Sequence, residues 1–151
     1  MTGPGRFVAG LAAVLVLAAT PVYAQAQAPA GHIKTVTGGA SIIRGGSAIA
    51  ATPGAAIYAT DTLRTGADGA VGVTLQDDTR VSLGASSEMR VDRYVYAPAE
   101  GGFGMVLKFL RGAAVYVSGR MAKLAPDSVR LETPSGIVGV RGTTVAIRID
   151  G

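Results

Sequence analysis

The groups that could carry out catalysis are scarce in this sequence. Its 151 residues contain no cysteine and one histidine, His32. Thiol catalysis is therefore excluded, and a serine triad would require His32 to be held rigidly beside a serine and an acid. A zinc site takes several histidine or cysteine ligands, which this chain does not have. We expect an exposed His32 just before the first strand, and no catalytic, metal-binding or cofactor-binding residues.

The acidic residues offer two further kinds of chemistry. Asp77 and Asp78 could bind a hard cation, but a calcium loop needs more oxygen ligands at set spacing. Adjacent aspartates between two strand patterns are far more typical of a turn. A pair of carboxylates could also hydrolyse a glycosidic bond, and the candidates for such a pair are Asp61, Glu88, Asp92 and Glu132. Since these acids mostly occupy the polar positions of strands, a hydrolase is the weakest of the function classes.

Two tyrosines could form a binding surface. Tyr94 and Tyr96 share one face of the strand pattern MRVDRYVYA, because side chains alternate across a strand. Such a pair could stack on a sugar of the cell wall or anchor a protein partner. The alternative, which is the commoner arrangement, is that both rings cover a neighbouring strand.

The N-terminal segment predicts export. One positive charge, on Arg6, precedes the apolar run FVAGLAAVLVLAA, whose length of roughly 13 residues fits a signal peptide and is short for a membrane span. Val22 and Ala24 stand where signal peptidase requires small side chains, and Ala24-Gln25-Ala26 is an alternative cleavage site. We predict a cleaved signal peptide and a periplasmic or secreted protein of a Gram-negative bacterium.

The remaining chain divides simply and carries little net charge. We predict a signal peptide over residues 1–24, a flexible lead over 25–30 and one domain over 31–151. Removing Arg6 lowers the formal charge from +4 to +3, which is too mild and too scattered to indicate nucleic-acid binding. No later segment is apolar enough to be a retained membrane span.

The hydrophobic pattern predicts an all-β fold. Val71, Val73 and Leu75 alternate with polar or small residues, Asp77-Asp78 follows, and the alternation resumes with Arg80 to Leu83; this predicts a β-hairpin. Similar short runs recur as far as Ile149, the run Met105–Leu110 is typical of a central or covered strand, and residues 122–127 predict a helical turn or a loop. Short strands and many glycines favour a β-roll or solenoid-like domain, with a β-sandwich as the alternative.

Three segments together resemble the FecR domain family. Asp61, Leu63 and Thr65 match its Asp-x-(apolar)-x-Thr motif, and the hairpin around Asp77 with the following Ser87 matches the next part. These matches lie in the first segment. The second segment, LKFLRGAAVYV, resembles the family's Leu-x-x-Gly part, and the third, TPSGIVGVRGTTVAI, resembles its Val-Arg-Gly-Thr signature on Val140, Arg141, Gly142 and Thr143. Two positions differ from the family pattern, since glycine is usual where this chain has Thr60 and Asp78.

The resemblance implies an all-β fold and a role in protein recognition. The family's name-giving members are envelope regulators with a cytoplasmic sigma-factor-binding domain and a membrane helix, and this chain resembles the exported members that lack both. The family commonly continues through another pair of strands after Val-Arg-Gly-Thr, whereas this chain stops at Gly151. A natural end and a truncation are both open, and we expect an exposed strand edge near the C-terminus.

Arg141 raises a choice between architecture and ligand binding. It lies between Val140 and Gly142 in a strand-rich, glycine-rich setting, where a guanidinium can donate to carbonyls or to a carboxylate. We hypothesise that Arg141 is a structural clasp partnered by Asp61, since both belong to motif segments; the alternative is an anionic ligand. Breaking a buried clasp from one side costs about 3–5 kcal/mol, so an unchanged urea midpoint in Arg141→Ala would refute the clasp.

These observations predict a non-enzymatic FecR-like domain that recognises an envelope protein, as a signalling accessory or an assembly module. The structural motif residues are expected to be Asp61, Thr65, Asp77, Arg141, Gly142 and Thr143. The alternative is a carbohydrate or cell-wall binding module, in which Tyr94 and Tyr96 form the platform. The identity of the partner, the oligomeric state and any signal are not specified by the sequence.

Overall fold

The computed structural model describes residues 2–5, 10, 18–20, 27–140 and 144–150. Most of the predicted signal peptide lies outside these residues, as do Arg141, Gly142 and Thr143. Among the described residues, no helix is both long and apolar enough to cross a membrane. The first strand begins at Gly31, the residue at which the predicted domain starts.

Strands dominate the described chain, as the sequence predicted. In chain order they are β1 (Gly31–Thr37), β2 (Ala40–Arg44), β3 (Ser47–Ala50), β4 (Ala56–Ile57), β5 (Thr62–Thr65), β6 (Ala70–Leu75), β7 (Arg80–Leu83), β8 (Glu88–Ala97), β9 (Gly102–Val117), β10 (Val129–Thr133), β11 (Gly136–Val138) and β12 (Thr144–Ile149). Three short helices complete the structure: η1 (Pro98–Glu100), α1 (Arg120–Leu124) and η2 (Pro126–Ser128). His32 is exposed but lies within β1 rather than before it.

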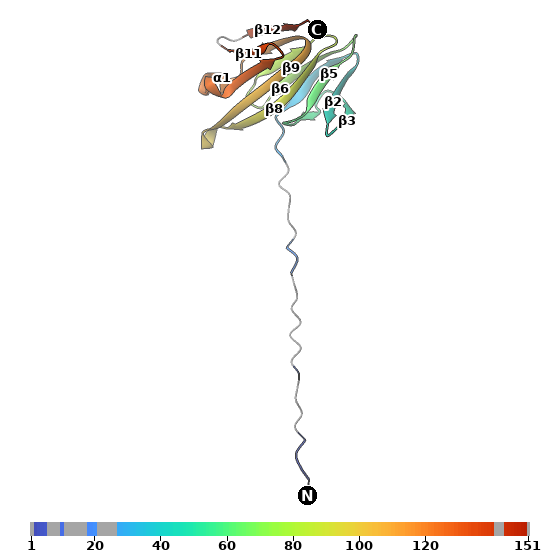
Figure 1. Cartoon of the computed structure of the whole chain (residues 1–151), viewed down its shortest axis with the longest axis vertical. Coiled ribbons are helices and arrows are strands. Elements are labelled where there is room, and N and C mark those ends of the chain that lie inside the picture. Colours follow the sequence, from blue (N-terminus) through green and yellow to red (C-terminus); the bar gives the residue numbers. More distant parts are fainter. Residues whose placement is uncertain (1, 6–9, 11–17, 21–26, 141–143, 151) are drawn as a thin grey trace.

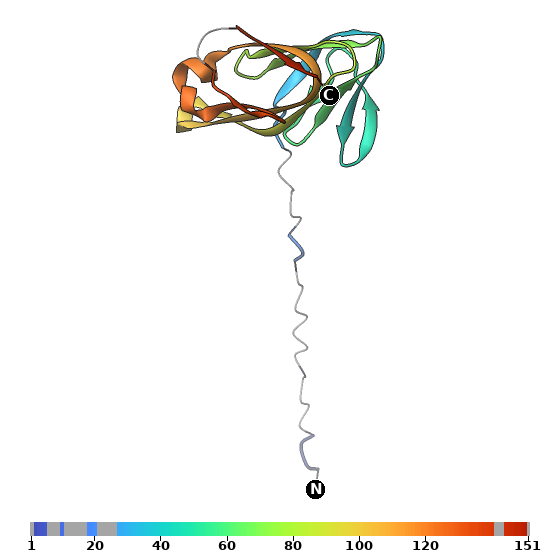
Figure 2. The ribbon, with the colours of Figure 1, turned by 45° about the horizontal axis from the view of Figure 1, so that its top comes forward.

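The strands form one curled half-barrel sheet (Figures 1 and 2). The order along the sheet is β3-β2-β5-β8-β9-β7-β6-β1-β4, while β10 and β12 pair with the remaining edge of β9 and β11 pairs with β10. The pairs are antiparallel except β9 with β10. The all-β prediction is therefore confirmed, and of the arrangements left open a roll describes this single curled sheet.

Strand β9 is the central strand of the domain and pairs with four other strands. Its first part lies between β8 and β10, and its second part lies between β7 and β12. Gly112 separates the two parts and has a φ of +85°, a conformation that L side chains rarely adopt. The predicted strand Met105–Leu110 is therefore only part of a single bent strand of 16 residues.

The predicted hairpin is confirmed as β6 and β7. Val71 pairs with Leu83 and Val73 with Val81, and these four side chains are buried. The turn closes through hydrogen bonds of Leu75 with the main chain of Asp78 and Thr79. Alternation therefore assigned the correct residues to the inner face.

Two rows of paired residues build the core on the inner face. One row runs Ile33, Val73, Val81 and Tyr116 across β1, β6, β7 and β9; the other runs Ile42, Leu63, Met89 and Phe109 across β2, β5, β8 and β9. Both rows are buried apolar ladders, and cross-strand pairs of this kind are the unit of sheet stability. The core therefore extends along the whole curl of the sheet.

Short helices form the crossover connection between β9 and β10, the one parallel pair among the described strands. β9 and β10 are parallel, so the chain must cross from one end of the pair to the other. It does so through α1 and η2, which end before β10, and Pro126 prevents α1 from continuing. Of the two alternatives predicted for residues 122–127, a helical turn or a loop, the structure contains short helical turns.

Candidate functional site

Five polar side chains are buried among the described residues: Asp61, Thr65, Asp77, Thr79 and Ser87. Buried polar groups must find hydrogen-bond partners, because leaving them unpaired is costly. The five form three clusters, centred on Asp77, on Asp61, and on Thr65 with Ser87. Four of them belong to the sequence motifs described above, and Thr79 completes the Asp77 cluster.

The Asp77 carboxylate joins three separate segments. It accepts hydrogen bonds from the Thr79 hydroxyl at 2.7 Å, from the Tyr94 hydroxyl at 2.9 Å and from the Met121 N–H at 3.1 Å. The Asp77 main chain also engages, since its N–H donates to the Tyr94 oxygen and its carbonyl accepts from the Arg120 N–H. Asp77 thus ties the hairpin tip to β8 and to the first turn of α1.

Sequence reasoning placed Asp77 at a turn, and that placement is confirmed. It did not predict that the Asp77 side chain would be fully buried. Asp78, by contrast, is exposed and forms an ion pair with Arg120 at 3.2 Å. The difference arises because α1 covers the hairpin tip. Gly119 permits this cover, since a Cβ at that residue would collide with the main chain of Asp77 and Thr79.

Tyr94 and Tyr96 lie on the inner side of β8 and pack against the core. Between Val91 and Arg93 the register shifts, because β8 has one more residue than β9 at this point. Beyond this bulge, the even-numbered tyrosines lie on the same face as Met89 and Val91. The Tyr94 hydroxyl is bonded to Asp77, and the Tyr96 ring lies 6.2 Å from that of Phe103. This arrangement is the one in which the rings cover a neighbouring strand.

The environment of Tyr94 changes its acidity. Burial raises the pKa of its hydroxyl above the ordinary value, and the negative charge of Asp77 and their hydrogen bond raise the pKa further. A group that transfers protons in catalysis needs a pKa near the working pH. The Tyr94 hydroxyl, whose pKa is raised, therefore serves as a neutral, structural hydrogen-bond donor to Asp77.

Arg44 holds the buried carboxylate of Asp61. Its guanidinium contacts both carboxylate oxygens, at 3.0 Å from Nε and 2.8 Å from Nη2, and also donates to the Ala56 carbonyl at 3.1 Å. The Tyr58 N–H donates to the same carboxylate at 2.9 Å, and the Tyr58 ring lies 4.7 Å below the guanidinium. The hydrogen bond to Asp61 raises the pKa of Arg44, so the guanidinium stays charged.

Arg44 ends β2 and is followed by a turn, and the sequence did not indicate its role. The partner hypothesised for Asp61 was Arg141, which lies outside the described residues. A bidentate arginine–carboxylate pair is formed across strands, so the separation of 17 residues between Arg44 and Asp61 carried no local signal.

Thr65 and Ser87 form the third cluster. The Thr65 hydroxyl donates to the Gly84 carbonyl at 2.6 Å and accepts from the Ser87 N–H at 2.9 Å. The Ser87 hydroxyl lies 3.0 Å from the Ala113 N–H, which donates to it. Gly112 is required beside it, because a Cβ there would collide with the Ser87 hydroxyl. These hydrogen bonds hold the loop between β7 and β8 against the bend in β9.

The four candidate acids of a hydrolase are all engaged by arginines. Asp61 is held by Arg44 as described, and the other ion pairs are Glu88 with Arg64 and Arg111, Asp92 with Arg90, and Glu132 with Arg130. Glu88, Asp92 and Glu132 lie on the outer side of the sheet, whereas Asp61 is buried, which corrects its expected polar position. Within the described chain, no cluster of three or more histidine, cysteine or acidic side chains could hold a metal ion.

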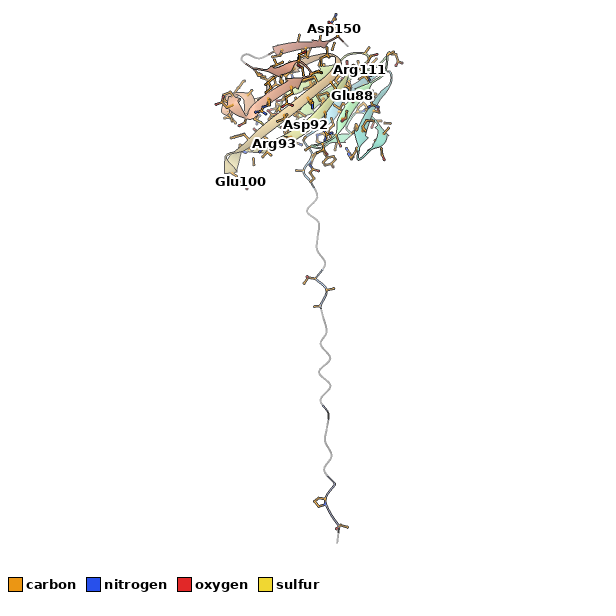
Figure 3. All side chains as sticks on the ribbon, in the orientation of Figure 1. Glu88, Asp92, Arg93, Glu100, Arg111 and Asp150 are labelled. Carbon is orange, nitrogen blue, oxygen red and sulfur yellow. The ribbon has the colours of Figure 1, made fainter. Side chains whose placement is uncertain are left out.

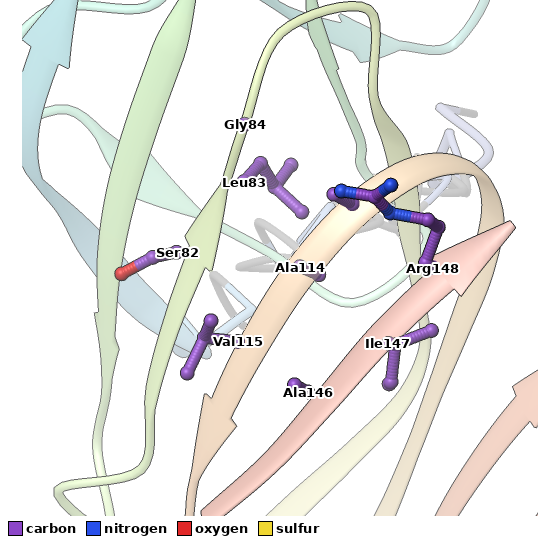
Figure 4. Close-up of a pocket in the computed structure, with 9 residues that line it drawn as sticks. Ser82, Leu83, Gly84, Ala114, Val115, Ala146, Ile147 and Arg148 are labelled. Atoms are coloured by element: carbon purple, nitrogen blue, oxygen red, sulfur yellow. The ribbon is translucent and has the colours of Figure 1, made fainter.

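The surface also has hollows. One of about 460 Å³ lies where β7, β9 and β12 run side by side and is lined mainly by alanine, glycine and aliphatic side chains, with Ser82 and Arg148 as its polar members (Figure 4). Another, of about 580 Å³, is bordered by Gln76 and by residues 94–97. Both linings are suited to contact with a partner and lack a nucleophile–base pair.

The described chain is thus a small all-β half-barrel with buried polar motif residues and a charged outer face. The model of the family described as FecR protein matches residues 61–151. This chain belongs to the FecR family, which suggests a role related to envelope signalling. No curated protein and no solved structure gives a significant match to the chain.

Proposed function

We propose that this domain is exported to the periplasm and acts without catalysis, by recognising another envelope protein as a signalling accessory or an assembly module. One observation carries the proposal: the motif residues Asp61, Thr65, Asp77 and Ser87 are all occupied by hydrogen bonds inside the fold. The features left for a partner are the outer face of the sheet and strand edges.

Strand addition is one mechanism for that recognition. Within the described residues, β12 pairs only with β9 and β11 only with β10. An unpaired strand edge can accept an extended segment of another protein.

In-cell crosslinking of a tagged copy, followed by mass spectrometry of the adducts, tests the proposal. We expect the same envelope protein to be captured in repeated experiments and to be lost when an exposed strand is altered. Adducts that contain glycan alone would contradict protein recognition.

A cell-wall binding module is the second candidate. It is favoured by the hollow beside Gln76, which Tyr94 and Tyr96 both line. Because the Tyr94 hydroxyl holds Asp77, Tyr96→Ala is the cleaner test. Under this alternative, Tyr96→Ala abolishes retention on immobilised peptidoglycan while the melting transition is preserved; unchanged retention would refute it.

A further inference from the structure

Charged side chains gather on the outer side of strands β5, β8, β9 and β10. We call this surface the basic face; it comprises Arg64, Glu88, Arg90, Asp92, Arg93, Lys108, Arg111, Arg130 and Glu132, with Asp127 of η2 at its margin. Several of these residues are labelled along the sheet in Figure 3. Strand register aligns them in rows: Arg64 with Glu88 and Arg111, and Arg90 with Lys108 and Glu132.

Within the described residues, the excess of positive charge lies on the basic face. The face contains six cationic and four acidic side chains, which gives a net charge of +2. The rest of the described chain contains six cationic and six acidic side chains, which gives a net charge of zero with His32 neutral.

The acids of the face do not neutralise it evenly. Glu88 contacts both Arg64 and Arg111, while Asp92 and Glu132 each contact one arginine. Among the described residues, no carboxylate lies within ion-pair distance of Arg93 or Lys108. These two are therefore the cations of the face that have no carboxylate partner within the described residues.

Arg93 lines an open hollow of about 280 Å³, together with Arg130, Asp127, Gly104 and Val106. Arg93 is aligned with Val106, and Lys108, which is not part of this lining, follows two residues later on the same side of β9. Gly104 leaves room for the arginine, since a Cβ there would lie only 3.0 Å from the Arg93 Nε.

We propose that the basic face is the docking surface for a protein partner whose contact area carries an excess of exposed carboxylates. This inference rests on the proposed function and specifies the chemistry of the partner. Arginines set between aliphatic side chains such as Val106 are typical of protein interfaces, and guanidinium groups bind carboxylates in a bidentate manner. Charge complementarity steers such an encounter and selects the partner.

Two other occupants fit the face less well. A uniform polyanion would meet Glu88, Asp92, Glu132 and Asp127 between the cations, and like charges placed together are unfavourable. Among its described residues, a second copy of this chain would offer either the same basic face or a remainder with no net charge, and neither is complementary.

The size of the face sets the strength of the contact. Four strands spaced about 4.8 Å apart and three rows of outward side chains spaced about 6.8 Å apart give the face a footprint of roughly 400 Å². Specific stable interfaces bury about 800 Å² on each partner. The basic face alone therefore supports a transient contact that weakens as salt screens the exposed charges.

The first test measures binding of a fluorescent peptide in which glutamate alternates with serine, with the glutamine version of the peptide as the neutral probe. We expect Arg93→Glu combined with Lys108→Glu to weaken binding of the glutamate peptide at least tenfold. The matched control reverses two exposed cations outside the face, Lys34→Glu with Arg80→Glu, and should retain binding. If the first double variant fails to fold, Arg93→Gln with Lys108→Gln replaces it.

The other outcomes overturn the proposal. Equal loss in both double variants would mean that total charge, not this face, attracts the peptide. Equal binding of the glutamine peptide would exclude recognition of carboxylates. Tighter binding of heparin than of the glutamate peptide would favour a uniform polyanion over an acidic protein.

Site-specific photo-crosslinking in the cell separates this inference from the proposed function. A photoreactive residue replaces Val106 on the face or Ala146 on β12. Protein adducts through Val106 that disappear with Arg93→Glu and Lys108→Glu support the proposal. Adducts through Ala146 alone would leave protein recognition standing and contradict the basic face. Absence of protein adducts at both positions would contradict protein recognition itself.

Discussion

Two residues of the motif segments adopt a backbone conformation that suits glycine. Thr60 has a φ of 76° and Asp78 a φ of 67°, and these are the two positions at which glycine is usual in the pattern that the chain resembles. A β-branched residue at positive φ is a genuine outlier. Each of these residues therefore keeps the turn of the family and accepts strain that glycine would avoid.

Replacing Thr60 by glycine should stabilise the domain. We expect the free energy of unfolding to rise by about 1 kcal/mol, because a strained left-handed conformation costs about that much for a residue with a Cβ. Urea denaturation measures the change. Thr62→Gly, in strand β5, is the control and should lower stability; if both variants are destabilised, the strain at Thr60 is not significant.

Tyr94 should make stability depend on pH in the alkaline range. Burial and Asp77 raise the pKa of Tyr94 in the folded state, so its contribution is fully present below the unfolded pKa near 10 and declines as pH rises above that value. Burial also raises the pKa of Tyr116, with the same sign. We expect the urea midpoint to fall above about pH 10.

Tyr94→Phe should reduce that alkaline decline and lower stability at neutral pH by about 1 kcal/mol, since Asp77 loses one donor. Tyr96→Phe is the matched control, because within the described residues the Tyr96 hydroxyl makes no recorded hydrogen bond. An alkaline profile in Tyr94→Phe that is identical to the unmodified protein would show that the Tyr94 hydroxyl is not protected.

At the scale of elements, two glycines allow close packing that the strand pattern alone does not explain. Gly112 lies at the bend of β9 against Ser87, and Gly119 lies where α1 meets the hairpin tip. In both places the neighbour is largely main chain, which cannot move aside as a flexible side chain can.

Gly119→Ala should be strongly destabilising. Its Cβ would overlap the Thr79 N–H and the Asp77 carbonyl, so α1 must move and the bonds from Arg120 and Met121 to Asp77 must lengthen. We expect a loss of about 2–4 kcal/mol in thermal or urea unfolding. Gly139→Ala should be close to neutral, because no described atom lies within 4 Å of a Cβ at this residue. A comparable effect at the two positions would contradict this packing.

The sequence predicted elements whose evidence is local and missed those that depend on distant contacts. Alternation and Asp77-Asp78 were sufficient for the β6–β7 hairpin, because pairing across a short turn follows from neighbouring residues. The bulge in β8 and the continuity of β9 through Gly112 depend on partners far along the chain. The Arg44–Asp61 pair was missed for the same reason. Asp61, Thr65 and Asp77 were named as structural motif residues from the family pattern, and all three are buried.

At the scale of the whole molecule, the three polar clusters connect segments that are distant in sequence. Arg44 and Asp61 fasten the β2 end, Thr65 and Ser87 fasten the bend of β9, and Asp77 fastens the hairpin to β8 and α1. With no cysteine in the chain, such buried bonds and the apolar core carry the stability.

The central claim is that the motif residues hold the fold and do not form an active site, and Asp77 tests it most directly. The measurement is the free energy of unfolding of Asp77→Asn compared with that of its exposed neighbour, Asp78→Asn. We predict a loss of about 2–4 kcal/mol for Asp77→Asn, because an amide cannot accept all the hydrogen bonds that the buried carboxylate accepts. Asp78→Asn should change stability by less than about 0.5 kcal/mol. Equal stability of the two variants would contradict the account.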